Sequence, residues 1–303
     1  MLDRLTTRRR RRFFSGGWGP RPALERYLEV LGEPPPSQGI SVSWSPPYAQ
    51  DSLWQRDGTY KSPHQYLPTE ARRGRLRLVW RHAVPERVCV LFAATNEHGY
   101  KSRFRVALRL IEAGIAVAIP ENPFYGSRRV PGGGPHTVYE SLVMGRASVE
   151  EGLALVSVLS DDFAVGVSGY SMGGSIASLV SATSPIPVAT AAMGASHSPA
   201  PVFTEGALAH YVDWSALGGE NARRELAMTL GQASTLRAPA PAHTAGAILA
   251  LARQDLYVPP HSVIDLHRHW PGSELRWLRG GHASLHLRGR AQARLIRDAF
   301  SRL

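Results

Sequence analysis

Short apolar runs alternate along this chain with longer segments of mixed polarity. The apolar runs have the length of buried strands and cover residues 88–93, 114–119, 163–168, 187–193 and 245–252. Helices are predicted between them, notably at residues 100–113 and 137–159, and residues 76–82 and 274–279 are further strand candidates. Strands that alternate with helices predict an α/β fold with a mostly parallel sheet and helices on both faces.

Three stretches depart from this rhythm. Residues 1–35 are predicted to form a basic leader followed by an amphipathic helix, and residues 36–75 to form irregular structure and short strands. Residues 36–303 are long enough for one domain. Within them, residues 195–241 are rich in Pro, Ala and Gly and interrupt the alternation, as a cap insertion would. The cap is either a lid over an acyl pocket or an additional packing helix without substrate contact.

A G-x-S-x-G motif provides the first indication of chemistry. It comprises Gly169-Tyr170-Ser171-Met172-Gly173, preceded by the apolar run 163–168 and followed by a helical pattern at 174–180. Strand, sharp turn and helix in this order are typical of the nucleophile elbow of the α/β-hydrolase fold. Glycines are expected beside the serine because a side chain there would collide with the neighbouring strand and helix. A glycine-rich turn that only packs is the alternative interpretation.

A serine nucleophile needs a base and an acid that orients the base. In this fold the acid and the histidine follow the serine in the chain, each after a later strand. Asp255 follows the run 245–252, and His282 follows 274–279, so both stand in the required order. Asp213 and Asp265 are the competing acids. No metal or other cofactor is expected, because the C-terminal histidines lack carboxylates at metal-ligand spacing.

Another histidine, His286, lies four residues beyond His282 and is interpreted as a surface residue on the final helix. The oxyanion hole is expected to use the backbone N–H of Met172 and one from the loop after residues 88–93. Thr95 and Asn96 are the candidates for that second donor.

A second loop, residues 121–129, follows a strand at the edge where α/β folds bind ligands. Tyr125, Arg128 and Arg129 in this loop are candidate substrate-binding residues. The two arginines could hold a phosphate or carboxylate group, or they could be solvated in a surface loop.

The sequence resembles the alpha/beta-hydrolase domain-containing protein 18 family from about residue 13 to the end. The shared motifs are Gly17-Trp18-Gly19-Pro20, the Glu-Asn-Pro-aromatic-Tyr-Gly block within 121–129, Gly169-Tyr170-Ser171-Met172-Gly173-Gly174, and Gly281-His282. The resemblance implies a serine-hydrolase fold, with Ser171, Asp255 and His282 at the positions of the family's triad. An acyl-lipid substrate is compatible with this resemblance.

One loop departs from the family pattern. The family has Ala-Gly-Thr-Gly-Asp-His where this chain has Ala-Ala-Thr-Asn-Glu-His at residues 93–98, so Ala94 and Asn96 replace glycines. If either position requires a positive φ, Asn tolerates it better than Ala.

The formal net charge is +11, and every basic residue except Lys61 and Lys101 is arginine. The N-terminus is especially basic, with Arg4 and Arg8–Arg12. This composition suits an anionic lipid or nucleic-acid partner, an organelle transit peptide, or a general preference for arginine. No nucleic-acid-binding motif accompanies the charge, so nucleic acid is not an expected partner.

The order of residues 8–14 suits a membrane surface. Arginines would meet anionic head groups, and Phe13 and Phe14 would enter the interface, giving reversible peripheral contact. A solvated tail is the alternative. The chain has no apolar run near the ~20 residues of a membrane span and no secretory signal, and its single Cys89 excludes an internal disulfide. A cytoplasmic protein is therefore expected.

Together these features predict a serine hydrolase that cleaves a carboxylic ester, most simply an acyl-lipid ester, through an acyl-enzyme on Ser171. Two alternatives stay open: a non-catalytic binding protein with the same fold, and an amidase or peptidase.

Overall fold

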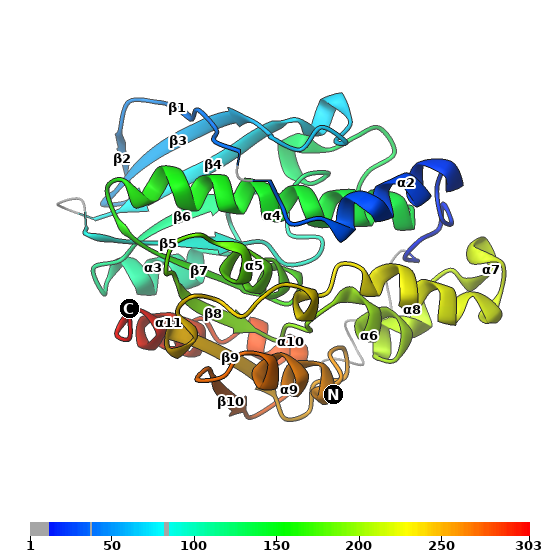
Figure 1. Ribbon diagram of the computed structural model, residues 1–303. Helices are drawn as coiled ribbons and strands as arrows, with labels where there is room; N and C mark the ends of the chain where they lie inside the picture. Colours follow the sequence, from blue (N-terminus) through cyan, green and yellow to red (C-terminus); the bar gives the residue numbers. More distant parts are fainter. Residues whose placement is uncertain (1–11, 37, 82–84) are drawn as a thin grey trace.

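One large sheet crosses the molecule. Within residues 12–36, 38–81 and 85–303, which the computed structural model describes, ten strands form a sheet of order β1-β3-β4-β6-β5-β7-β8-β9-β10, with β2 paired to β3 (Figure 1). The strands are β1 (Ser43–Trp44), β2 (Tyr48–Gln50), β3 (Leu53–Lys61), β4 (Arg73–Trp80), β5 (Arg87–Phe92), β6 (Ala116–Pro120), β7 (Ala164–Tyr170), β8 (Ala189–Met193), β9 (Ala247–Ala252) and β10 (Glu274–Leu278).

The strands from β5 to β10 pair in parallel, whereas β1 to β4 pair antiparallel and β4 joins β6 antiparallel. The mostly parallel sheet is therefore confirmed. The expectation of only irregular structure and short strands at residues 36–75 is wrong, because β3 spans nine residues. Its burial alternates only imperfectly, since one face of this antiparallel extension is partly open to solvent, so its sequence lacks a continuous apolar run.

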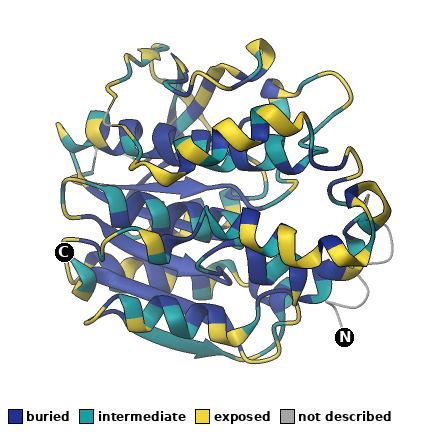
Figure 2. Cartoon of the chain, turned by 45° about the vertical axis from the view of Figure 1, so that its right-hand side comes forward, coloured by how far each residue is buried: buried dark blue, intermediate teal, exposed yellow. Residues whose placement is uncertain are grey.

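Helices cover both faces of the sheet. On one face, α3 (Phe104–Ile111) and α11 (Gly289–Phe300) bury apolar side chains against β5, β6, β8 and β9. On the other, α4 (Val138–Ser160) and α5 (Met172–Thr183) pack on β5 and β7, and α9 (Pro260–His269) packs on β9. The parallel strands from β5 to β9 are buried from both sides and appear mostly dark blue in Figure 2, whereas β10 at the edge is only partly buried. This double cover explains why their sequences are continuous apolar runs.

The N-terminal segment packs against the segment 195–241 and helix α4. Helix α2 (Arg21–Gly32) contacts α4, and Phe14, only 2% exposed, belongs to one apolar cluster with side chains from the segment 195–241. Phe13 packs edge-on against Phe203, and its backbone exchanges hydrogen bonds with Tyr211 and Asp213. The expectation that Phe13 and Phe14 enter a membrane interface is wrong, because both rings contribute to this internal packing.

Arg4 and Arg8–Arg11 lie outside the described residues, and Arg12 is exposed. None of the helices in the described part of the chain is long and apolar enough to cross a membrane. Cys89 is fully buried in β5, and burial raises the pKa of its thiol.

The segment 195–241 lies between β8 and β9, as expected for an insertion. It contains α6 (Pro199–Thr204), α7 (Trp214–Leu217) and α8 (Arg223–Gly231), which stand together beside the sheet (Figure 1). The backbone N–H of Ala207 donates to the carbonyl of Leu256, so this segment touches the loop that follows β9.

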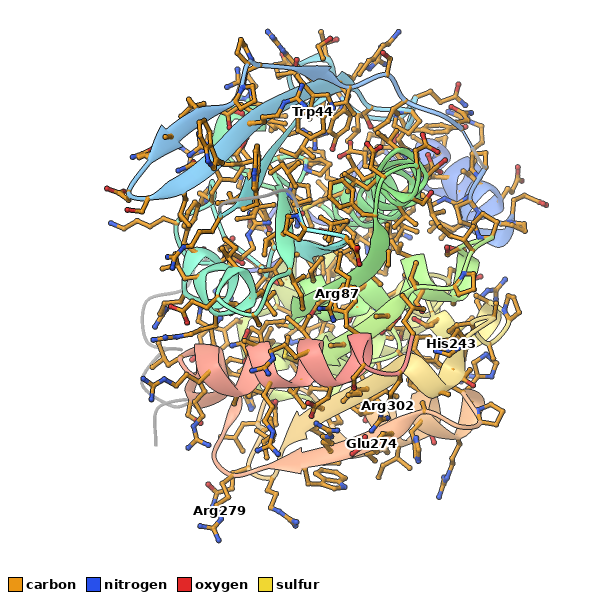
Figure 3. All side chains as sticks on the ribbon, turned by 90° about the vertical axis from the view of Figure 1, so that its left-hand side faces the viewer. Trp44, Arg87, His243, Glu274, Arg279 and Arg302 are labelled. Carbon is orange, nitrogen blue, oxygen red and sulfur yellow. The ribbon has the colours of Figure 1, made fainter. Side chains whose placement is uncertain are left out.

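The chain end is joined to the outermost parallel strand. Arg276 on β10 pairs with Glu274 and with Asp298 on α11. Arg302 also donates to Glu274, and Figure 3 shows these two labelled residues close together. The hydrogen bond from Arg276, reinforced by Arg302, lowers the pKa of Glu274 to about 2.

Candidate active site

Ser171 lies at a sharp turn between β7 and α5. Its backbone has φ 56° and ψ −123°, a positive-φ conformation that costs a non-glycine residue roughly 1–3 kcal/mol. A Cβ on Gly169 would lie 2.3 Å from the carbonyl carbon of Gly173, and a Cβ on Gly173 would lie 2.5 Å from the carbonyl oxygen of Phe92. Neither position accommodates a side chain, because backbone atoms cannot move aside as side chains can. The predicted strand, turn and helix are therefore present, with α5 starting against the ends of β5 and β7.

Three side chains from separate strand ends meet at this turn. Ser171 follows β7, Asp255 follows β9, and His282 follows β10. His282 Nε2 lies 3.1 Å from Ser171 Oγ, and His282 Nδ1 lies 2.7 Å from Asp255 Oδ2. The carboxyl ends of parallel strands share one edge of the sheet, so residues far apart in the sequence become neighbours here.

The Asp255 carboxylate is held from two directions. Its side chain is fully buried, and its Oδ1 accepts hydrogen bonds from the backbone N–H groups of Tyr257 and Val258, both at 2.9 Å. Its Oδ2 faces His282 Nδ1. Because a carboxylate only accepts, this arrangement favours the imidazole tautomer that carries its proton on Nδ1. Nε2 then faces Ser171 as an acceptor.

Two tyrosines that the sequence analysis did not single out flank His282. The rings of Tyr170 and Tyr257 each lie with their centroids 4.8 Å from the imidazole, and the Tyr170 hydroxyl donates to the His282 carbonyl. Gly194 closes the third side: a Cβ there would lie 3.0 Å from the Tyr170 ring. Their positions in the sequence could have identified these two tyrosines, since Tyr170 directly precedes Ser171 and Tyr257 lies two residues after Asp255.

The competing residues have other contacts. Asp213 caps α7 by accepting from the Ala216 N–H, and Asp265 pairs with the exposed Arg268 on α9. His286 ends the short helix α10 (His282–His286) and does not belong to the final helix α11. The expectation of a surface role is wrong, because the His286 ring packs on Tyr170 at 5.0 Å, and burial lowers its pKa.

The expected oxyanion donors lie on two adjoining elements. Met172 is the first residue of α5, where helix geometry provides no acceptor for its N–H. The loop after β5 carries Thr95, half-buried, and Asn96, exposed with φ 62°. The position that requires a positive φ is thus occupied by Asn, whereas the other altered position, Ala94, does not have a positive φ. A second donor from Thr95 or Asn96 stays a prediction.

The sequence analysis did not identify Glu97, whose carboxylate is buried beneath this loop. Glu97 Oε2 accepts from the Ala94 N–H at 2.7 Å, and the other oxygen accepts from the Ser102 hydroxyl. Arg103 lies 3.4 Å from Glu97 and donates to the carbonyls of three loop and strand residues, Leu91, Gly99 and Pro120. The Ala94 N–H is therefore engaged by Glu97 and is not free to act as an oxyanion donor.

The structure contradicts both interpretations of Arg128. Its side chain is fully buried rather than solvated, and it forms a two-pronged ion pair with Glu151 at 2.6 and 2.7 Å. It also donates to the carbonyls of Ala71 and Glu121, so no N–H group is left for a substrate. Arg129 is exposed, whereas Tyr125 is 3% exposed, and burial raises its pKa to about 12. Arg128 therefore braces this edge of the sheet, because its charge is neutralised by Glu151 of helix α4.

No group of three or more potential metal ligands occurs among the residues that the structure describes. The features that remain are a serine, a histidine and a buried carboxylate in hydrogen-bonding order, beside a helix N-terminus.

Comparison with known proteins agrees with this architecture. A family model described as Alpha/beta hydrolase domain containing 18 matches residues 11–240 and 218–302. An acetyl xylan esterase from Paenibacillus sp. R4 has a TM-score of 0.62 and 16% identity, covering 90% of this chain and 92% of that chain. Acetyl xylan esterase 1 from Thermoanaerobacterium sp. JW/SL YS485 has a TM-score of 0.59 and 13% identity, covering 94% of this chain and 96% of that chain.

A cold-adapted esterase from an Arctic intertidal metagenomic library is also similar, with a TM-score of 0.55 and 16% identity over 84% of this chain and 99% of that chain. At these identities the similarity establishes the fold alone. Together with the family match, it shows that this chain has the α/β-hydrolase fold and belongs to the alpha/beta hydrolase domain containing 18 family.

Proposed function

We propose that this protein is a serine hydrolase that cleaves carboxylic esters through an acyl-enzyme on Ser171. The observation that carries the proposal is the continuous hydrogen-bonded series from Ser171 through His282 to Asp255. An alcohol is a poor nucleophile at neutral pH, and an adjacent base with an oriented ring overcomes this. The esterases among the similar structures favour an ester over an amide.

In the proposed reaction, Ser171 Oγ attacks the ester carbonyl and His282 Nε2 takes its proton. Asp255 stabilises the imidazolium that forms, and His282 then returns the proton to the leaving alcohol. Water, deprotonated by the same histidine, attacks the acyl-enzyme and releases the acid. The Met172 N–H, at the positive end of α5, would donate to the developing oxyanion.

The proposed substrates are esters with an apolar acyl chain, such as acyl lipids. Met172 adjoins the nucleophile and packs in an apolar cluster with cap residues that include Phe203 and Trp214. An acyl chain that extends from Ser171 toward this cluster would gain about 0.8 kcal/mol for each buried methylene. We therefore expect kcat/KM to rise from p-nitrophenyl acetate to p-nitrophenyl octanoate.

A fluorophosphonate probe on the purified protein tests the proposal. The probe should label the wild-type protein, and Ser171→Ala should abolish labelling and lower kcat by ~10⁴-fold or more. Ser175→Ala is the matched control, because Ser175 lies one helical turn further on and its hydroxyl only donates to the Ser196 carbonyl. A wild-type protein that resists the probe would favour a non-catalytic binding protein, and hydrolysis retained by Ser171→Ala would refute the assignment.

A further inference from the structure

A pocket lies in the antiparallel part of the sheet, remote from Ser171. It has a volume of about 380 Å³ and is bordered by β1, β3, the start of β4 and the short 3-10 turn Thr69–Ala71. This volume lies in the range of pockets that bind small organic ligands. Three of its lining residues are basic, Lys61, Arg72 and Arg73, and all the others carry hydroxyl groups.

The cations of this pocket form no ion pair with an acidic side chain among the described residues, although the exposed Glu70 stands in the turn that borders it. None of the residues that line it is acidic. The ion pairs found within the described residues include neither Lys61 nor Arg72 nor Arg73. The nearest carboxylate on β3, Asp57, is already bound to Arg77 by two hydrogen bonds of 2.7 and 3.0 Å. Three uncompensated cations around one hollow attract an anion.

Two features fix the pocket before any ligand arrives. Arg72 donates to the carbonyls of Leu67 and Gln65 at 2.8 and 3.0 Å, which fixes its guanidinium plane while leaving its charge uncompensated. Lys61 and Arg73 are directly paired across β3 and β4, so the two cations face the same side of the sheet. Arg72, which is held in this way, loses little side-chain entropy on binding, and strand pairing places the other two cations on one side of the sheet.

The buried Arg128 holds one wall in place. It donates twice to the carbonyl of Ala71, at the end of the 3-10 turn that contributes Thr69 to the pocket, and once to the carbonyl of Glu121 after β6. This role accounts for the burial of a charged side chain that binds no substrate.

The pocket faces the same edge of the sheet as Ser171. Leu76 on β4 is paired with Pro120 at the end of β6, so the chain before Leu76 runs beyond the carboxyl end of the parallel strands. Strand β3 stands four positions from β7 in the sheet (Figure 1). At about 4.8 Å between neighbouring strands, the pocket lies roughly 19 Å from the line of β7.

We propose that this pocket is a binding site for a phosphate group carried by an organic molecule, either a soluble phosphate ester or an anionic lipid head group. Guanidinium groups match phosphate oxygens in geometry, an ammonium group adds a point charge, and hydroxyl groups such as that of Thr59 supply neutral donors. The volume exceeds what a single phosphate requires, so the organic part of the ligand is also accommodated. The site depends on neither Ser171 nor the reaction proposed above.

Calorimetric titration of the full-length protein with glycerol 3-phosphate, and with glycerol as the neutral reference, tests this site. The phosphate ester should bind and glycerol should not. The double variant Lys61→Gln, Arg73→Gln should weaken binding by about tenfold or more, because two charge-assisted contacts are removed. Arg75→Gln is the matched control: Arg75 is exposed on the same strand, two residues from Arg73, and does not line the pocket.

Co-sedimentation with phosphatidylglycerol vesicles distinguishes the two ligand sources. If the double variant sediments less than Arg75→Gln, the ligand is a lipid head group; if the two sediment equally while glycerol 3-phosphate binding differs, it is a soluble ester. Wild-type protein that binds glycerol 3-phosphate no better than glycerol, or an Arg75→Gln variant that weakens binding as much as the double variant, would overturn the site. Ser171→Ala should retain phosphate binding, and the double variant should retain probe labelling, so this site and the proposed reaction fail separately.

Discussion

Asp255→Asn is the substitution for which the structure predicts the most specific effect. Asp255 Oδ1 accepts from two backbone N–H groups, those of Tyr257 and Val258, and both residues are almost fully buried. An asparagine must keep its oxygen at this position, because the amide NH₂ would face two donors. Each buried N–H left without an acceptor costs about 1–3 kcal/mol. The two donors therefore force the NH₂ group toward His282.

This orientation reverses the imidazole tautomer. His282 Nδ1 must now accept from the introduced side-chain amide, so the ring proton moves to Nε2, which faces Ser171 Oγ at 3.1 Å. A base that carries its proton on the wrong nitrogen cannot take one from the serine. We expect kcat to fall by ~10⁴-fold, the loss typical of this change in a serine triad. That factor corresponds to about 5.4 kcal/mol of transition-state stabilisation.

The assay is kcat/KM for p-nitrophenyl esters, together with the rate of fluorophosphonate labelling. Both should fall, while the thermal transition stays near that of the wild type, because the amide and carboxylate have the same shape. Asp265→Asn is the matched control, since Asp265 lies in the same part of the chain but is 40% exposed and pairs only with Arg268. If Asp255→Asn retains activity within about tenfold of the wild type, the orienting role of Asp255 is refuted.

Three further predictions concern stability. Gly173→Ala should lower the free energy of unfolding, measured in urea, by about 1–3 kcal/mol and slow probe labelling, because its Cβ would meet the Phe92 backbone. Gly145→Ala is the control: a Cβ there has no atom within 4 Å, so this variant should be neutral or more stable by up to about 1 kcal/mol. Arg128→Ala should lower the free energy of unfolding by about 3–5 kcal/mol, because its buried partner Glu151 loses its ion pair. Arg129→Ala, at an exposed position, should change the free energy of unfolding by no more than about 0.5 kcal/mol. A rise in KM for anionic esters in Arg128→Ala, without loss of stability, would contradict the bracing role. Glu274→Gln should lower the melting temperature at neutral pH. The lowered pKa of Glu274 gives a stabilisation that is present above its ordinary pKa of 4.5 and is lost as the pH falls toward 2. The difference in melting temperature between the wild type and this variant should therefore shrink over that pH range, and a constant difference would contradict the prediction.

The central parallel sheet could be predicted from the sequence because its strands are covered on both faces. A strand buried from both sides must be apolar throughout, so β5 to β9 stand out as continuous runs, and their observed bounds differ from the predicted ones by only a few residues. The same regularity places Ser171, Asp255 and His282, because chain order and strand ends follow from the fold once the elbow is recognised.

Tertiary structure decided the features that depend on contacts between remote segments. The long strand β3 was missed because its outer side is open to solvent and tolerates polar residues. Arg128 was interpreted as a ligand-binding residue because no residue of its own loop indicates its ion pair with Glu151, which lies on the following helix, α4. Phe13 and Phe14 looked like membrane contacts because their partner Phe203 lies almost 200 residues away.

Local sequence therefore determined which segments become the central parallel strands and which strand ends carry Ser171, Asp255 and His282, since periodicity and order along the chain report these directly. It did not determine whether a given charge or ring is buried, because burial depends on which surfaces meet when the chain closes on itself. The same physics separates two groups of arginines: Arg128 is neutralised by a carboxylate from another element, whereas Arg72 and Arg73 meet no such partner among the described residues.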